Sequence, residues 1–150
     1  MKLSTRSRYG TRMLLDIALH GEDGPVRIRD ISQRQGVSVK YLEKLIRPLK
    51  QARLVRSKRG PKGGHMLNRA PENISVGELV RLFEDELVLT RCVKEEKICP
   101  ISNDCLTRQV WIEAGDAMYN RLDSVKLSDL MTEAKRVGGI GKRCFAAGEI

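Results

Sequence analysis

The 150-residue chain has no run of about 18 apolar residues, the length that a membrane-spanning helix needs. Its first six residues are charged, but they lack the apolar stretch and the small-residue cleavage site of a secretory signal. We therefore expect a soluble, cytoplasmic protein without a membrane partner. In that reducing compartment, structural disulfides between the four cysteines are not expected.

The patterns of common catalytic sites are also missing. The chain contains no Cys-x-x-Cys pair, which argues against a thiol oxidoreductase. His20 and His65 fall in separate expected elements, so a Cys-His nucleophile pair is disfavoured. The glycine-rich turn 60–64 lacks the Gly-Lys-Ser/Thr ending of a phosphate-binding loop. We therefore expect that the protein is not an enzyme.

What the chain does have is an uneven excess of basic residues. Residues 1–70 hold 17 Lys or Arg against 5 Asp or Glu, whereas residues 71–150 hold 11 against 14. A basic half of this kind is the electrostatic footprint of a protein that binds duplex DNA, because the phosphates attract it regardless of base sequence. A nonspecific DNA-binding protein, or a merely solvated basic surface, would explain the same charge.

The basic half is organised around an amphipathic helix expected over residues 38–52. One face carries four apolar residues at helical spacing: Leu42, Leu45, Ile46 and Leu49. Ser38 is a suitable N-cap. A shorter helix over 28–35 precedes it across a turn at Gly36, and two helices joined in this way are the sequence form of a helix-turn-helix.

Downstream of these helices, residues 54–58 and 65–67 predict two strands joined by the basic turn 59–64. A helix-turn-helix followed by a hairpin is a winged helix, and Val26-Arg27 is expected to add a short strand to the hairpin. Further helices are expected from Ser4 or Thr5 to about His20 and from Ser75 to about 84, the second opened by the capping-box spacing Ser75-Val76-Gly77-Glu78. The fold class is therefore mainly α with a small β-hairpin, and residues 1–84 form a DNA-binding winged helix-turn-helix domain.

The remainder divides into three segments by its pattern. Residues 85–105 show no sustained period and are expected to form a cysteine-bearing sensor loop. Residues 106–137 predict helices, the first with an apolar side made of Leu106, Val110, Ala114, Ala117 and Leu122, widened by Trp111 and Met118. We expect these helices to form a homodimer, the alternative being that they pack back on their own domain. Residues 138–150 predict a disordered tail.

The polar face of the 38–52 helix is expected to read double-stranded DNA. Four residues would lie nearest the bases: Lys40, Tyr41, Glu43 and Lys44. Arg47 continues this face, and Ser38 with the helix N-terminus would meet a phosphate. Glu43 is the discriminating residue, because a carboxylate near phosphates is repelled unless it accepts a hydrogen bond, typically from cytosine N4.

The turn between the strands is expected to contact a minor groove. Arg59 would insert there because Gly60, Gly63 and Gly64 allow the backbone to approach the DNA closely. The alternative is a plain phosphate contact by Arg59. A dimer of such domains would bind a pseudo-palindromic operator.

Three cysteines fall in the expected loop with the spacing Cys92-x6-Cys99-x5-Cys105. Soft thiolates on a flexible loop can hold an iron-sulfur cluster or zinc. Zinc is the less natural choice because the paired Cys-x2-Cys knuckles of zinc sites are absent. A metal-free thiol switch remains the alternative, and Cys144 is expected to be a lone thiol of the tail.

Together these pieces resemble the IscR, NsrR and CymR family of bacterial regulators over about residues 1–137. The resemblance rests on Tyr9, on Ser38-Val39-Lys40-Tyr41-Leu42-Glu43, on the wing Arg59-Gly60-Pro61-Lys62-Gly63-Gly64, on the start of the helix at Ser75, and on the three cysteines before Trp111. It implies a homodimeric winged-helix transcription factor in which Tyr9 and Pro61 join the DNA-binding residues. It also implies that the helix through Trp111 forms the dimer and that Cys92, Cys99 and Cys105 hold a 2Fe-2S or 4Fe-4S cluster.

Two positions depart from the family pattern. IscR-type members have a histidine three residues after the last cysteine, where this chain has Arg108, which cannot ligate a metal. NsrR-like members use an acidic side chain of the partner's first helix, where this chain has Arg8. The fourth ligand is therefore unassigned, and the candidates are a small exogenous molecule or one of Glu95, Glu96, Asp104 and Cys144.

Overall fold

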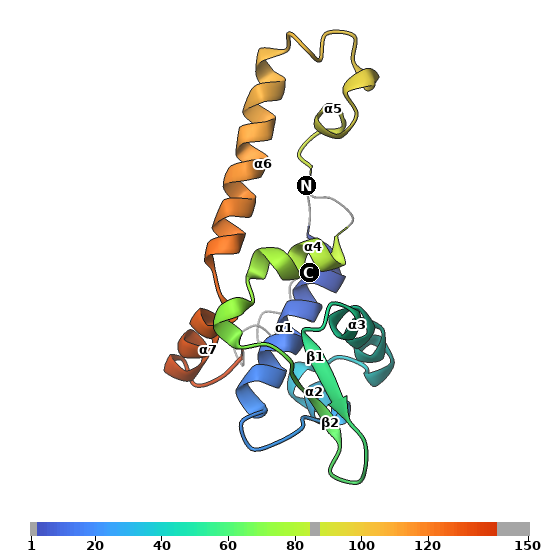
Figure 1. Cartoon of the computed structure of the whole chain (residues 1–150), viewed down its shortest axis with the longest axis vertical. Coiled ribbons are helices and arrows are strands. Elements are labelled where there is room, and N and C mark those ends of the chain that lie inside the picture. The colour runs from blue at the N-terminus through green and yellow to red at the C-terminus, as the bar shows by residue number, and fades with distance from the viewer. Residues whose placement is uncertain (1–2, 85–87, 141–150) are drawn as a thin grey trace.

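The computed structural model describes residues 3–84 and 88–140. In chain order the elements are α1 (Thr5–His20), α2 (Ile28–Gln35), α3 (Val39–Gln51), β1 (Val55–Lys58), β2 (Gly64–Leu67), the 3-10 helix η1 (Pro71–Asn73), α4 (Val76–Phe83), α5 (Arg91–Lys94), the 3-10 helix η2 (Glu96–Ile98), α6 (Leu106–Ser124) and α7 (Leu127–Arg136). The mainly α fold with one small hairpin is therefore confirmed. Figure 1 shows the first four α-helices gathered around the hairpin, whereas α6 projects away from them.

The helix-turn-helix forms for the reasons that its sequence suggests. The Ser38 hydroxyl accepts a hydrogen bond from the Tyr41 amide at 3.3 Å and so caps α3. Gly36 adopts the left-handed conformation (φ 65°) at the end of α2, which a glycine adopts without steric cost. The Ser32 hydroxyl donates to the Val37 carbonyl at 2.6 Å, which fixes the turn between the two helices.

The wing is an antiparallel hairpin in which Val55 pairs with Leu67 and Lys58 with Gly64. Val26 forms an isolated antiparallel bridge with His65 and so adds one residue of a third strand to the edge of the hairpin. A Cβ on Gly64 would lie 2.6 Å from the Val26 carbonyl oxygen, so this close approach of backbones requires glycine.

The apolar stripes of α1, α3 and α4 meet in one core. The four stripe residues of α3 are all buried, and they pack with Met13, Leu14 and Ile17 of α1 and Leu79 and Phe83 of α4. A Cβ on Gly10 would lie 2.2 Å from the Phe83 ring, so the glycine is what allows α4 to lie against α1. Leu127 of α7 closes the same core.

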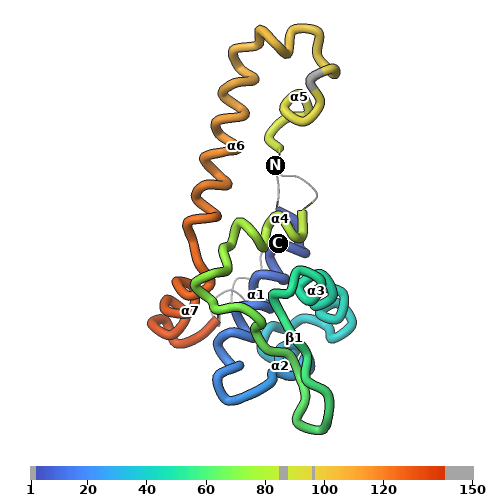
Figure 2. Tube along the Cα trace, in the orientation of Figure 1, coloured from blue at the N-terminus to red at the C-terminus, as the bar shows by residue number. Residues whose placement is uncertain are grey.

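The C-terminal helices are joined to this domain through α4. Ser75, the N-cap of α4, forms an isolated β-bridge with Lys126, and Arg81 makes two hydrogen bonds of 2.7 Å to the Asp123 carboxylate of α6. The Cα trace in Figure 2 shows α6 running outward from this junction, with the segment that contains α5 beside its far end. No helix of the described ranges is both long and apolar enough to cross a membrane.

Two expected details differ from the structure. The Ser75 hydroxyl caps α4 as predicted, accepting from the Glu78 amide at 3.0 Å, but the Glu78 carboxylate pairs with Arg69 instead of completing a capping box. The expected loop 85–105 contains the short helices α5 and η2, which are too brief to show a period in sequence. Of the expected tail, residues 141–150 lie outside the described residues.

Candidate DNA-binding face and cysteine loop

The N-terminal end of α3 is held by an aromatic contact with α1. The rings of Tyr9 and Tyr41 meet edge to face with centroids 5.9 Å apart. The Tyr41 hydroxyl donates to Thr5 Oγ1 at 3.3 Å, and the Arg12 guanidinium lies 5.4 Å from the Tyr9 ring centroid. Tyr9 is half-buried against the core, so its ring supports the Tyr41 ring from the core side. Sequence reasoning missed Thr5 and Arg12, which have no distinguishing pattern.

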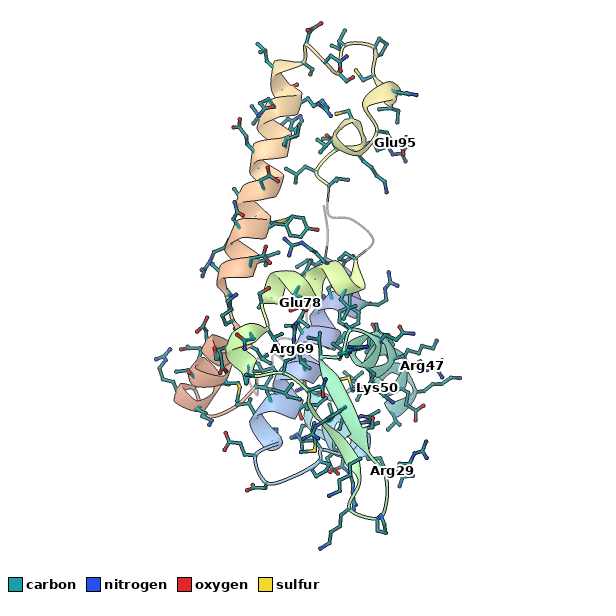
Figure 3. The ribbon with its side chains drawn as sticks, in the orientation of Figure 1. Arg29, Arg47, Lys50, Arg69, Glu78 and Glu95 are labelled. Atoms are coloured by element: carbon teal, nitrogen blue, oxygen red, sulfur yellow. The ribbon has the colours of Figure 1, made fainter. Side chains whose placement is uncertain are left out.

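The outward face of α3 carries the polar residues expected to read DNA. Lys40, Glu43, Lys44 and Arg47 are all exposed, whereas Tyr41 is half-buried. Figure 3 shows Arg47 on the outer side of α3, Lys50 between α3 and the wing, and Arg29 of α2 beside the wing on the same side of the domain. This side is thus more basic than the candidate residues alone suggested.

The wing turn presents Arg59, Gly60 and Pro61 to solvent. Gly60 has φ 111° and a Cβ on Gly63 would lie 2.3 Å from the Lys58 carbonyl oxygen, so both positions require glycine. The Arg27 guanidinium donates to the Pro61 carbonyl at 2.5 Å and ties the turn to the start of α2. Sequence reasoning did not identify Arg27, which had been noted only as strand.

His65 lies on the wing strand that faces the domain. Its Nδ1 is 3.0 Å from the Ser57 hydroxyl across the strand pair. Burial lowers the pKa of His65, and the positive charge of Lys50 lowers it further. The imidazole therefore favours its neutral form, and it belongs to wing packing rather than to a catalytic site.

A buried ion pair joins α1 to α2 beneath this face. The Asp16 carboxylate is 1% exposed and accepts hydrogen bonds from Arg34 and from the Gln35 amide, the latter at 2.9 Å. Gln35 in turn accepts from Arg12 Nε at 2.9 Å. Sequence reasoning missed this network, although an aspartate inside the apolar run Leu14-Leu15-Asp16-Ile17 was the signal that could have revealed it.

Glu84 lies where the winged-helix domain leads into the cysteine loop. Its carboxylate accepts a hydrogen bond from the Ser4 amide at 2.8 Å and another from the Ser7 hydroxyl, both at the N-terminal end of α1. Desolvation alone would raise the pKa of Glu84, but the hydrogen bonds from Ser7 and Ser4 outweigh it, and the pKa is lowered. The start of the loop is thus fastened to the helix that supports Tyr41.

The three cysteines of the loop are free thiols and half-buried. Arg108 of α6 donates from Nε to the Cys92 carbonyl at 2.9 Å, so the residue that replaces the family histidine holds the loop against the helix. Cys105 Sγ lies 3.2 Å from the Thr107 hydroxyl. That hydrogen bond, together with the Arg108 backbone amide, lowers the pKa of the Cys105 thiol.

The donors of this loop suit an iron-sulfur cluster by their chemistry, because thiolates are the usual ligands of iron-sulfur clusters. Their geometry is not preformed: within residues 3–84 and 88–140, no group of three His, Cys, Asp or Glu side chains is placed to hold an ion. Among the candidate fourth ligands, Glu95 and Asp104 are exposed, and Cys144 lies outside the described residues. Figure 3 shows Glu95 next to α5, away from the winged-helix domain.

The outer face of α6 is apolar and exposed. No described residue of this helix is buried, and Leu106, Val110 and Trp111 are 86%, 54% and 40% exposed. Ala114 and Ala117 extend the same stripe. The expected members Met118 and Leu122 are half-buried, in the part of α6 that packs against α4, where Arg81 lies over the Tyr119 ring and pairs with Asp123.

Comparison with known proteins agrees with this architecture. Residues 3–133 match the family model described as "Rrf2: Iron-dependent Transcriptional regulator". Protein rrf2 of Nitratidesulfovibrio vulgaris (strain Hildenborough) is 53% identical over 134 residues, which cover 89% of each chain.

Two solved structures are similar as well. T. potens IscR is 33% identical with a TM-score of 0.75, covering 97% of this chain and 96% of that one. CymR (YrzC), the global cysteine regulator of B. subtilis, is 32% identical with a TM-score of 0.76, covering 89% of this chain and 98% of that one. A winged-helix domain, a projecting helix and a family match over 131 of 150 residues lead to one conclusion: the chain belongs to the Rrf2 family of transcriptional regulators, which are not enzymes.

Proposed function

We propose that this regulator is a cytoplasmic homodimer whose binding to a pseudo-palindromic operator responds to an iron-sulfur cluster held by Cys92, Cys99 and Cys105. The observation that carries the proposal is the attachment of the cysteine loop at both ends. One end follows Glu84, which fastens the N-terminal end of α1, and the other continues into α6. A change in the loop would therefore act on the DNA-binding domain and on the dimer helix together.

In this proposal α3 enters the major groove with its N-terminal half toward the bases. Lys40, Tyr41, Glu43, Lys44 and Arg47 supply the contacts, with Ser38 at a phosphate. Exposure of the four charged residues and the bracing of Tyr41 by Tyr9 support this orientation. The wing residues Arg59, Gly60, Pro61, Gly63 and Gly64 would meet the adjacent minor groove.

The dimer would form through the exposed stripe of α6. An exposed stripe of large apolar side chains on a projecting helix is costly in water and is typical of an interface. Two copies related by a two-fold axis would present two α3 helices to half-sites one or more helical turns apart. The alternative, in which α6 packs only on its own domain, accounts for its half-buried side but not for Leu106 and Val110.

Three observations support the cluster. The family model is described as iron-dependent, a structural neighbour is an IscR, and the loop offers three unpaired thiols. The fourth ligand stays unassigned because Arg108 occupies the histidine position. A bound cluster would supply a redox-active, oxidant-sensitive group, and the loop would have to draw its thiols together around it.

A metal-free thiol switch is the second candidate. It is favoured by the finding that no three side chains within residues 3–84 and 88–140 are placed to hold a metal ion, and by the similarity to a regulator named for cysteine. In that case oxidation of the thiols, rather than loss of a cluster, would change operator binding.

Anaerobic reconstitution of the full chain with iron and sulfide tests the proposal. The wild type should take up a coloured cluster, and the triple variant Cys92→Ala, Cys99→Ala, Cys105→Ala should not. Operator affinity should differ about 5- to 150-fold between wild-type protein with and without the cluster, the usual range of coupling between two sites. A colourless wild type whose operator affinity changes on mild thiol oxidation would instead establish the thiol switch. Identical affinity in every state would refute both.

A further inference from the structure

A cavity of about 420 Å³ lies between α1, α2 and α7. This volume falls within the range of about 300–1,000 Å³ that is typical of small-molecule sites. The residues that matter for its chemistry come from all three sides: Leu19 and His20 of α1, Arg34 of α2, Ala134 and Lys135 of α7, and Ile140 beyond it. The cavity is separate from the DNA-binding residues and from the cysteine loop.

Arg34 enters this cavity already oriented. Its Nε lies 3.1 and 3.2 Å from the two Asp16 carboxylate oxygens, and its Nη2 lies 2.5 Å from one of them. Asp16 therefore occupies the Nε side of the guanidinium. Nη1 makes no hydrogen bond or ion pair within the described part of the chain, and the side chain is 34% exposed. The outer edge of the guanidinium is thus a fixed, unused fork of donors.

Among the residues that line the cavity, the two cations Arg34 and Lys135 face a single carboxylate, that of Asp16. Asp16 is buried and its oxygens already accept from Arg34 and Gln35, so the Asp16–Arg34 pair has no net charge and the attraction for an anion comes from the unused donors of Arg34 and from Lys135. The Nδ1 of His20 lies 2.9 Å from the Asp16 backbone carbonyl oxygen, so this ring nitrogen is already engaged in a hydrogen bond. Lys135 pairs with Glu22 at 2.9 Å, but both side chains are exposed and such pairs are weak.

Apolar side chains complete the site. Leu19, Ala134 and Ile140 line the cavity beside the charged edge. This combination of one oriented guanidinium and an apolar wall is the chemistry that recognises a carboxylate carried on an apolar body.

We propose that this cavity binds a small organic carboxylate, with the carboxylate on the outer edge of Arg34 and the apolar body against Leu19 and Ala134. The ligand would bridge α2, the first helix of the helix-turn-helix, and α7, which follows the projecting α6. Binding of this ligand would be a second signal to the regulator, independent of whether the cysteines hold a cluster. The simpler reading is that Arg34 only ties α2 to α1.

Protein-observed NMR of the full chain, titrated with benzoate and separately with uncharged benzamide, tests this site. Benzoate should shift the backbone amides of Leu19, Gln35 and Ala134 at millimolar concentration or below, whereas benzamide should not. Arg34→Lys keeps the charge opposite Asp16 but loses the planar fork, so it should weaken benzoate binding about tenfold or more. Arg69→Lys, which changes an arginine paired with Glu78 outside the cavity, should leave binding unchanged.

Leu19→Trp provides a second test, because it fills the cavity without touching the Asp16–Arg34 pair. It should abolish the benzoate shifts, while the amide chemical shifts of α2 remain those of the folded protein. The proposal is overturned by absence of benzoate shifts at the cavity, by equal shifts with benzamide, or by full binding in both Arg34→Lys and Leu19→Trp. Any of these results would leave Arg34 as a structural tie alone.

Discussion

The winged-helix domain and the projecting helix α6 differ in where their apolar side chains lie. Leu14, Leu42 and Leu49 of the domain are at most 1% exposed, whereas Leu106 at the start of α6 is 86% exposed. Both regions show apolar residues at helical spacing, and both are helices as that spacing predicts. Periodicity therefore identifies a helix and its apolar face, but not whether that face is covered by the same chain.

The sharpest way to test this contrast is to make the same substitution in both regions. Leu42→Ala should cost about 2–5 kcal/mol of unfolding free energy, because it leaves a cavity in a core that cannot fully collapse. Urea unfolding followed by circular dichroism measures this loss. Leu106→Ala, tested at protein concentrations low enough to keep the chain monomeric, should change stability by less than about 0.5 kcal/mol. Equal losses at the two sites would contradict the contrast.

A second test concerns the DNA sequence preference that we propose for α3. Glu43→Ala should broaden operator preference, because removing an exposed carboxylate from α3 removes its repulsion from wrong bases. Mismatch costs of about 1–3 kcal/mol should shrink at one position in each half-site. Selection from randomised operators measures the change, and sedimentation should show that oligomeric state is unaffected. An unchanged preference at every position would show that Glu43 does not discriminate between bases.

A smaller effect is expected at Glu84, where the winged-helix domain leads into the cysteine loop. The hydrogen bonds from Ser7 and Ser4 keep the folded-state pKa of Glu84 low, so their stabilisation is present above the usual pKa of a glutamate and is lost as the pH falls through the folded value. Glu84→Gln should therefore cost about 1 kcal/mol at neutral pH. Urea unfolding at neutral and acidic pH should show the gap between the two proteins closing on acidification. A gap that stays constant or widens would show that the carboxylate charge is not what stabilises this junction.

Sequence patterns were sufficient for the helix-turn-helix, because its determinants are local. Ser38 caps the nearest turn, Gly36 takes the left-handed conformation next to it, and the α3 stripe has a regular period. The wing was predicted for the same reason, from its own strand and turn residues. Each of these features depends on residues only a few positions apart.

What sequence could not supply depends on residues that are distant in the chain. Glu84 meets Ser4 from 80 positions away, and Asp16 meets Arg34 from 18, so neither pair leaves a local pattern. The Glu78 carboxylate pairs with Arg69 instead of completing the capping box of α4, because the folded chain brings Arg69 close to it. The three cysteines were found from spacing alone, yet spacing does not determine how close their thiols lie.

Sedimentation velocity shows whether the apolar stripe of α6 is completed by a second copy of the chain. Wild type should sediment as a dimer at micromolar concentration. Val110→Glu should sediment as a monomer, because it would bury a charge in the interface, whereas Gln109→Glu adds the same carboxylate beside the stripe and should remain dimeric. A monomeric wild type, or a Val110→Glu variant that stays fully dimeric, would contradict the account.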